Sequence, residues 1–465
     1  MMTTELWRKC AHELAAMIRS KEVSSREVVQ SHLDRIAAVN GKVNAITVTL
    51  AESALQAADR ADATAPTGPL HGVPFTIKEN IDCTGSATTQ GLPALVAAMP
   101  AADAPVVARM KAAGAIPLAR TNLPEMGLRI TTDNPLRGRT NNPWDPTRTA
   151  GGSSGGEGAA LATGMTPIGL GNDIGGSLRN PAYCCGVAAL KSTIGRIPMV
   201  ITIPNVSQPI SFRMMCVEGP MARSVADLKI AYRLLAGWHP NDPFSVPAAL
   251  EGPAVRRKAA LVTQMPFSTL PQSTVAAIRK AGQVLAAAGY EVEEAVPPEL
   301  ARVNEIWAHV LNADLQQALP LLTPVMSERA LAMLRGLLRK FDPASKTITE
   351  IYTERDRLAV AWSAFFQDYP VVIGPTWADL PFLHDADLDP ETGIETTLSR
   401  LQFITPGNLL GIPSVALPTG VADGLPTGVQ VYAERWREDL CLDVAGVIEA
   451  RLGRITPIDP VDHAA

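Results

Sequence analysis

The stretch from 151 to 186 constrains this chain more than any other, because glycine is concentrated there around three serines. It reads GGSSGGEGAALATGMTPIGLGNDIGGSLRNPAYCCG and contains Ser153, Ser154 and Ser177. Ordered glycine costs backbone entropy, so this density indicates a backbone that turns sharply or approaches another group closely. Clustered backbone N–H groups bind small anions. The stretch therefore predicts either a phosphate site or a site for an oxyanion that forms during a reaction.

Bulk properties exclude several classes of protein. The chain has 465 residues and a net charge of −5, so we expect no nucleic-acid partner. No apolar run reaches the ~20 residues that span a bilayer, and the first residues lack the apolar centre of a signal peptide. We therefore expect a cytoplasmic protein without a membrane partner. The six cysteines include no CxxC pair, so we expect small buried side chains rather than a metal site or a disulfide.

The order of the predicted elements favours an α/β fold. Strands are expected over 72–78, 115–119, 167–170, 187–190, 371–375 and 429–432, and further short apolar runs lie over 259–262, 290–292 and 415–417. Helices are expected between several of these strands, and such alternation builds a largely parallel sheet. The segment from about 298 to 368 departs from this order because it is helical almost throughout. Without repeats or a linker-like segment, the chain is expected to form one domain over 1–465.

Two phosphate-binding motifs fail at single residues. Gly151 and Gly156 have the P-loop spacing, but Glu157 stands where the lysine must be, and its carboxylate would repel phosphate. The dinucleotide motif G-x-G-x-x-G has Ile174 in place of its third glycine. An oxyanion is therefore favoured over a phosphate. A nucleotide-binding protein stays an alternative, for which ATP or NAD would raise the thermal stability.

A third hypothesis is the nucleophile elbow of α/β-hydrolases, G-x-S-x-G. Residues 151–155 match these letters around Ser153, but the elbow follows an apolar strand, whereas this serine follows the polar loop TNNPWDPTRTA. The elbow also needs a late histidine as base. His384 and His463 are the candidates, and both lie in polar segments. An esterase-like hydrolase of this type stays an alternative.

A fourth hypothesis uses Lys78, Ser153 and Ser177 and needs no histidine. Lys78 ends an apolar run, which is unusual because lysine is rarely buried without a partner or a function. A hydroxyl needs a base to become a nucleophile. Burial lowers the pKa of lysine and allows the neutral amine to be that base, with one serine passing the proton. The turn over 173–177 would aim successive amides at one oxyanion.

At these residues the chain resembles the amidase-signature family of serine hydrolases. The resemblance covers most of the chain apart from about 240–400, and Lys78, Ser153 and Ser177 lie in three separate motifs in the family order. The matching segments are HGVPFTIKEN (71–80), ARTNLPEMG (119–127), the long segment from NNPWDPTRTAGGSSGG to KSTIGRIP (141–198), EGPMARSV (218–225) and PGNLLGIPSVALPTG…GLPTGVQV (406–431).

The resemblance implies a role for each of these residues. Ser177 would be the nucleophile, Ser153 a bridging serine after a cis peptide bond, and Lys78 the general base. Ser154 would be a supporting serine that orients Lys78. The family's oxyanion hole corresponds to the amides of Ile174, Gly175, Gly176 and Ser177.

The resemblance also implies a fold and a reaction. The fold is a large, mixed, mostly parallel twisted sheet with helices on both faces. Its catalytic core would span about 65–235 and 400–455, and the helical excursion at about 298–368 would lie on the substrate side. The reaction is hydrolysis of a small carboxylic acid amide through an acyl-enzyme, without a metal or an organic cofactor. A homodimer is a possible assembly of this chain.

The substrate is less constrained by the sequence. The family includes amidotransferase A-type subunits that work with partner chains, and these commonly have alanine after GGSSGG. This chain has Glu157 and Gly158 there, which favours a stand-alone amidase. The 298–400 segment should determine the substrate. Its aromatic side chains could line an acyl pocket, although packing in the core is the simpler interpretation; they are Trp307, Phe365, Trp377 and Phe382.

Overall fold

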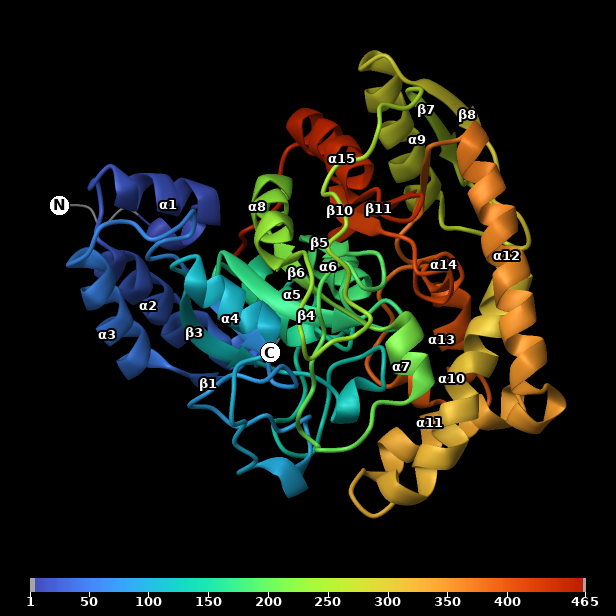
Figure 1. Ribbon diagram of the computed structural model, residues 1–465, viewed down its shortest axis with the longest axis horizontal. Helices are drawn as coiled ribbons and strands as arrows, with labels where there is room; N and C mark the ends of the chain where they lie inside the picture. The colour runs from blue at the N-terminus through green and yellow to red at the C-terminus, as the bar shows by residue number, and fades with distance from the viewer. Residues whose placement is uncertain (1–4, 463–465) are drawn as a thin grey trace.

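A computed structural model describes residues 5–462 and contains one continuous sheet of eleven strands (Figure 1). The spatial order of the strands is β1-β3-β2-β4-β6-β5-β10-β11-β9-β7-β8. The strands are β1 (Ile46–Thr49), β2 (Pro74–Lys78), β3 (Ile116–Thr121), β4 (Ile168–Asp173), β5 (Ala188–Lys191), β6 (Val217–Ala222), β7 (Lys258–Leu261), β8 (Glu291–Glu294), β9 (Val371–Pro375), β10 (Ser414–Ala422) and β11 (Leu425–Ala433).

Helices cover both faces of this sheet, as expected. Successive strand residues point to opposite faces, and neighbours such as Ala259 and Ala260 accordingly belong to two different buried clusters. One cluster includes side chains of α2 (Ser25–Val43), α3 (Ala51–Asp62), α5 (Gly155–Ala162), α6 (Arg179–Cys185), α10 (Leu300–Leu322) and α12 (Ile348–Asp368). The other includes side chains of α1 (Ala11–Arg19), α4 (Pro105–Ala112), α8 (Val225–Leu235), α9 (Gln272–Ala287) and α15 (Glu438–Leu452).

The sheet is mixed, but the expected excess of parallel pairs is wrong. The pairs β2–β3, β2–β4, β7–β8 and β7–β9 are parallel, whereas the other neighbouring pairs are antiparallel. The helix-linked strands β4 and β5 do run in the same direction. However, β6 lies between them and is antiparallel to both. Strands from later in the chain therefore separate strands that the local alternation alone would have paired.

Two strands were not expected from the sequence. β1 follows α2 directly, and β6 contains Gly219 and Pro220, which indicate a break when they are read locally. Pairing of β6 with β5 covers Met221 and Ala222 and does not extend to Pro220. On the β5 side Pro220 therefore has no ladder partner, so the proline is tolerated there without loss of a ladder hydrogen bond.

The helical excursion lies along one side of the molecule, at the right of Figure 1. It comprises α10, α11 (Glu328–Lys340) and α12, and α13 (Gly393–Leu401) and α14 (Thr405–Leu409) lie between it and the sheet. The short helix α7 (Ile210–Met215) contacts both α10 and α14. Within the described residues, no helix combines the length and apolar character that a bilayer crossing requires.

Candidate active site

The candidate site lies where β2 and β4 end. These strands are parallel neighbours, so their carboxyl ends meet at the same edge of the sheet. Lys78 is the last residue of β2, and Asp173 is the last residue of β4. Ser177 follows four residues after Asp173, and Ser153 precedes α5, which leads into β4. The topology thus brings together residues from segments that are far apart in the sequence.

Lys78 is completely buried and has two polar neighbours. Its Nζ lies 2.7 Å from Oγ of Ser153 and 2.7 Å from Oδ1 of Asn172. Asn172 in turn donates from Nδ2 to Asn80, which fixes its carbonyl oxygen toward the lysine. Burial lowers the pKa of Lys78 to about 7. A neutral amine at ordinary pH is therefore within reach of the Ser153 hydroxyl.

Ser153 and Ser177 approach the site from two glycine-rich turns. The peptide bond before Ser153 is cis, as the resemblance implied. The N–H of Ser154 donates to the carbonyl of Ser177 at 3.2 Å, which joins the two turns through the backbone. In the part of the chain that the structure describes, the hydroxyl groups of Ser153 and Ser177 are not hydrogen-bonded to each other. Catalytic hydrogen bonds often form only when substrate is bound, and we expect the contact between these two hydroxyls to close in that complex.

The turn after β4 is held by a buried ion pair. Arg179 donates from Nε to Asp173 at 3.0 Å, and both side chains are completely buried. Burial opposes ionisation of Asp173, but Arg179 and hydrogen bonds from Asn408 and Gly176 outweigh it and lower the pKa. Arg179 also donates to the Ile404 carbonyl at 2.8 Å. The carboxylate therefore stays charged and anchors the turn to α14.

The four predicted oxyanion amides are not equivalent. The N–H of Gly176 donates to Oδ1 of Asp173 at 2.8 Å, so its hydrogen is already engaged. The N–H groups of Ile174, Gly175 and Ser177 have no hydrogen-bond partner in the described chain. Three of the four amides thus remain available to an oxyanion. The fourth fixes the shape of the turn.

Ser154 does not contact Lys78 in the way that the resemblance implied. Its buried hydroxyl has no hydrogen-bond partner among residues 5–462, and Asn172 contacts the lysine instead. The reason is geometric, because Asn172 lies on β4 beside β2, whereas Ser154 is the N-cap residue before α5 and packs against Gly171. Asn172 was not predicted. The only available signal was a polar residue next to the end of an otherwise apolar strand.

Glu157 places a second buried carboxyl group close to Lys78. It accepts hydrogen bonds from the hydroxyls of Thr76 and Thr121, the latter at 2.7 Å. Thr76 precedes Lys78 by two residues on β2 and therefore lies on the same face. Burial raises the pKa of Glu157 to about 7, although the two threonines and Lys78 oppose the shift. Gly169 leaves room for this carboxyl, since a Cβ there would overlap Oε1.

An apolar cavity adjoins Ser177 (α10, α11 and α13 supply most of its wall). Trp307 belongs to it, whereas Trp377 and Phe382 pack in the core and Phe365 packs at the edge of the core. Arg129, the one charged residue in the wall, is paired with Asp387. The lining residues are Gly127, Leu128, Arg129, Ile130, Ile174, Gly175, Ser177, Trp307, Leu311, Leu315, Met333, Leu334, Leu337, Ile394, Thr397, Leu398 and Leu401.

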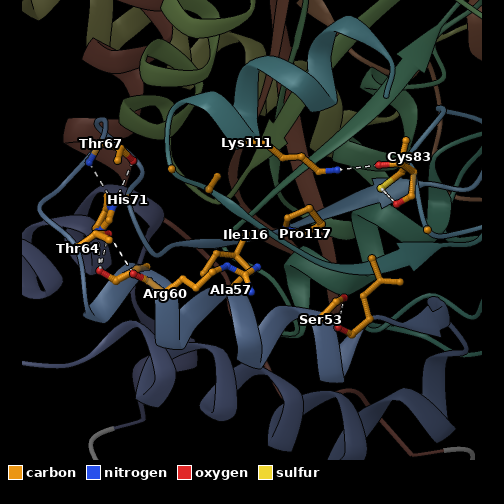
Figure 2. Close-up of a pocket in the computed structure, with 16 residues that line it drawn as sticks. Ser53, Ala57, Arg60, Thr64, Thr67, His71, Cys83, Lys111, Ile116 and Pro117 are labelled. Carbon is orange, nitrogen blue, oxygen red and sulfur yellow. Dashed lines mark hydrogen bonds between the residues drawn. The ribbon is translucent and has the colours of Figure 1, made fainter. Parts of the chain in front are cut away.

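A larger cavity, of about 550 Å³, lies near the opposite edge of the sheet (Figure 2). It includes Ile116, at the amino end of β3, together with His71 and Lys111. None of the predicted site residues lines it. His71 already bonds Thr67 and the Ala61 carbonyl, and Lys111 pairs with Asp103. Size alone therefore does not identify the place of the chemistry.

The nucleophile-elbow hypothesis finds no support in this geometry. Ser153 follows a loop rather than a strand, and its side-chain partner is Lys78. His384 directs Nε2 to the Pro146 carbonyl at 2.9 Å. His463, the other candidate base, lies outside the described residues. The cysteines were expected to be small buried side chains, and all six are free and buried.

Comparison with known proteins agrees with this geometry. The family model described as Amidase matches residues 27–442. Indoleacetamide hydrolase of Bradyrhizobium diazoefficiens is 40% identical over 459 residues, covering 96% of this chain and 87% of that protein. A glutamyl-tRNA(Gln) amidotransferase subunit of Salinispora arenicola is 30% identical, covering 98% of this chain and 99% of that protein.

A solved structure extends the comparison to the fold. The structure of 6-aminohexanoate cyclic dimer hydrolase complexed with substrate superposes with a TM-score of 0.83 at 30% identity, over 97% of this chain and 98% of that one. Together with the family match and the 40% identical relative, this likeness covers nearly all of the sequence. The chain therefore belongs to the amidase family and is a hydrolase of carbon–nitrogen amide bonds.

Proposed function

We propose that this amidase hydrolyses the primary amide of an arylacetic acid, with an indole-type ring as the acyl side chain. The observation that carries the proposal is the apolar cavity beside Ser177, which contains no unpaired charge and is lined by leucine, isoleucine, methionine and tryptophan. Apolar walls favour an aryl acyl group over a charged one. The 40% identity to an indoleacetamide hydrolase supports the same substrate class.

In the proposed mechanism Lys78 acts through Ser153 on Ser177. Asn172 accepts one amine hydrogen, so the lone pair of Lys78 can accept the Ser153 proton while Ser153 takes the Ser177 proton. The Ser177 oxygen then attacks the amide carbon, and the oxyanion accepts hydrogen bonds from the free turn amides. The proton returns to the departing nitrogen, which leaves as ammonia. Water then cleaves the acyl-enzyme by the same relay and releases the acid.

The cavity is narrow for this acyl group. Its volume is about 70 Å³, below the roughly 150 Å³ of a protein cavity that holds benzene. A bicyclic ring therefore requires side chains of the wall to move. Met333 in α11 is suited to this, because its unbranched thioether side chain adapts at little cost.

Thr397 provides a test of the ring chemistry. It lines the cavity, and its buried hydroxyl has no hydrogen-bond partner in the described part of the chain. An indole N–H can satisfy such a hydroxyl, whereas a carbon or sulfur isostere cannot. We expect Thr397→Val to lower kcat/KM for indole-3-acetamide about tenfold and to leave benzothiophene-3-acetamide unaffected. Equal losses on both amides would contradict an indole-binding role.

The catalytic assignment is tested by labelling and mutation. A fluorophosphonate probe should label Ser177, and mass spectrometry of the digested protein should find the adduct there. We expect Ser177→Ala and Lys78→Ala to fold and to lose at least about 10³-fold in kcat. Labelling of Ser153 in place of Ser177, or full activity in either variant, would contradict the assignment.

An amidotransferase component is the second candidate, supported by the 30% identity to the Salinispora arenicola protein. Such a component would need partner chains and would be inactive alone on simple amides. We expect the isolated chain to release ammonia from arylacetamides. Purification without partner chains followed by an ammonia assay separates the two functions.

A further inference from the structure

The indole of Trp307 packs directly on the turn that carries the free amides. Trp307 lies on α10 and is 4% exposed. Its Nε1–H donates to the carbonyl of Ile174 at 3.1 Å. A Cβ atom on Gly175 would lie 2.7 Å from Cζ2 of the ring. The indole therefore packs too closely on this residue to leave room for a side chain. Trp307 thus touches two successive residues of the turn.

This contact determines the direction of one amide. The Ile174–Gly175 peptide bond is not among the cis bonds of the chain. In a trans peptide unit the C=O and the N–H point in opposite directions. The hydrogen bond that holds the Ile174 carbonyl on the indole therefore also fixes the Gly175 N–H, which is one of the three amides without a partner.

We propose that Trp307 is a positioning residue that aims the Gly175 N–H at the oxyanion, in addition to forming a wall of the acyl cavity. The inference rests on the proposed function, because it presumes that Ser177 attacks an amide carbonyl. Preorganised donors stabilise a developing oxyanion without reorientation during the reaction.

The other side of the turn explains why a second anchor is needed. Asp173 fixes the Gly176 amide, and the Ile404 side chain lies against Gly176, where a Cβ would be 2.7 Å from Cγ2. Neither contact orients the preceding peptide unit. Gly175 leaves the second half of that unit without a side chain to limit its rotation. Trp307 supplies the limit from α10, in the segment over 298–400 that was expected to determine the substrate.

The central variant is Trp307→Phe, which keeps an aromatic ring and removes the N–H donor. We expect kcat for an arylacetamide to fall about tenfold, since one orienting hydrogen bond is lost, with a smaller change in KM. The matched control is Trp362→Phe. Trp362 is 1% exposed, donates its indole N–H to the Pro298 carbonyl at 2.9 Å and does not line the cavity. The control should lose comparable stability in urea and retain its kcat.

A pair of inhibitors separates positioning from simple lining of the cavity. An arylmethyl boronic acid forms a tetrahedral adduct on the nucleophile, whereas the arylacetate product does not. We expect Trp307→Phe to weaken the boronic acid by the same factor as kcat/KM and to leave the affinity for the product unchanged. Equal weakening of both would assign Trp307 to the cavity wall alone, and no change in either would overturn the proposal.

A second variant covers the case in which Trp307→Phe fails to fold. Gly175→Ala approaches the same contact from the turn, because its Cβ must displace the indole. We expect a loss of kcat and of boronic acid affinity with product affinity retained. Where both single variants fold, the double variant should lose less than the product of the two factors, because they break one contact. Independent, multiplicative losses would contradict the proposal. Failure of the proposed function would appear separately, because Ser177→Ala would then keep the full activity of the wild type.

Discussion

At the scale of single residues, the pKa of a buried group does not by itself identify a catalytic base. Burial lowers the pKa of Lys191 to about 7, as it does for Lys78. The Nζ of Lys191, however, donates to two backbone carbonyls, those of Gly407 and Ile412, at 2.5 and 2.7 Å. Lys78 instead faces a hydroxyl and an amide. The neighbours therefore distinguish an anchoring lysine from a candidate base.

The pH dependence of the reaction should report this lysine. A base must be neutral, and the pKa of Lys78 lies near 7, so protonation should remove activity below that pH. We expect kcat/KM to fall about tenfold per pH unit below this pKa and to level off above it. Steady-state rates from pH 5 to 9 check this. The control variant Lys191→Met should lose stability but keep the same acid limb. A wild-type profile that is flat from pH 5 to 9 would contradict the assignment of Lys78 as the base.

Glu157 should shift that profile. Its carboxylate favours the protonated form of Lys78 and so raises the lysine pKa, against the dominant effect of burial. Glu157→Gln removes the charge while keeping a polar partner for Thr76 and Thr121. We expect the acid limb of kcat/KM to move to lower pH. Glu449→Gln is the control, because it alters a mostly buried carboxyl group that accepts a hydrogen bond from the Val225 amide, away from the site. An acid limb that does not move in Glu157→Gln would show that Glu157 and Lys78 are not coupled.

At the scale of elements, α11 forms a wall that can tune the acyl cavity. Leu334 is buried and lines the cavity, whereas Leu331, one turn earlier, is buried without lining it. Truncating either leucine should cost about 2–5 kcal/mol of unfolding free energy. We expect only Leu334→Ala to raise kcat/KM for naphthaleneacetamide relative to phenylacetamide. The same change of preference in Leu331→Ala would mean that loosening of the helix, rather than added volume, is responsible.

At the scale of the whole molecule, one sheet connects the segments that the sequence assigned to the core and to the excursion. β9, which directly follows α12, pairs with both β7 and β11, so the excursion is inserted between strands of the same sheet. We infer that the chain is one folding unit. Calorimetry should give a single transition with matching calorimetric and van't Hoff enthalpies. Two separated transitions would contradict this inference.

The homodimer and the cytoplasmic location stay predictions.

The prediction from sequence succeeded where the information is local. Strand and helix identities around β2, β4 and α5 follow from apolar runs and glycine turns, and the motif residues Lys78 and Ser153 are in hydrogen-bond distance. It failed for β6, because a proline is acceptable in a strand where one side lacks a ladder partner, and Pro220 pairs with β4 but not with β5. It did not indicate that Asn172, rather than Ser154, contacts Lys78, or that the Asp173 carboxylate engages the Gly176 amide within the same turn.

The sequence by itself determined the α/β character, the glycine turns and the three residues of the proposed relay, because these depend on residue type and short spacing. Only the tertiary structure decided that Asn172 contacts Lys78, that Asp173 engages Gly176 and that Trp307 holds Ile174. Each of these contacts depends on how segments pack or how a side chain is oriented, and spacing along the chain specifies neither. The acyl cavity has the same origin, since its wall exists only where α10, α11 and α13 pack beside the end of β4.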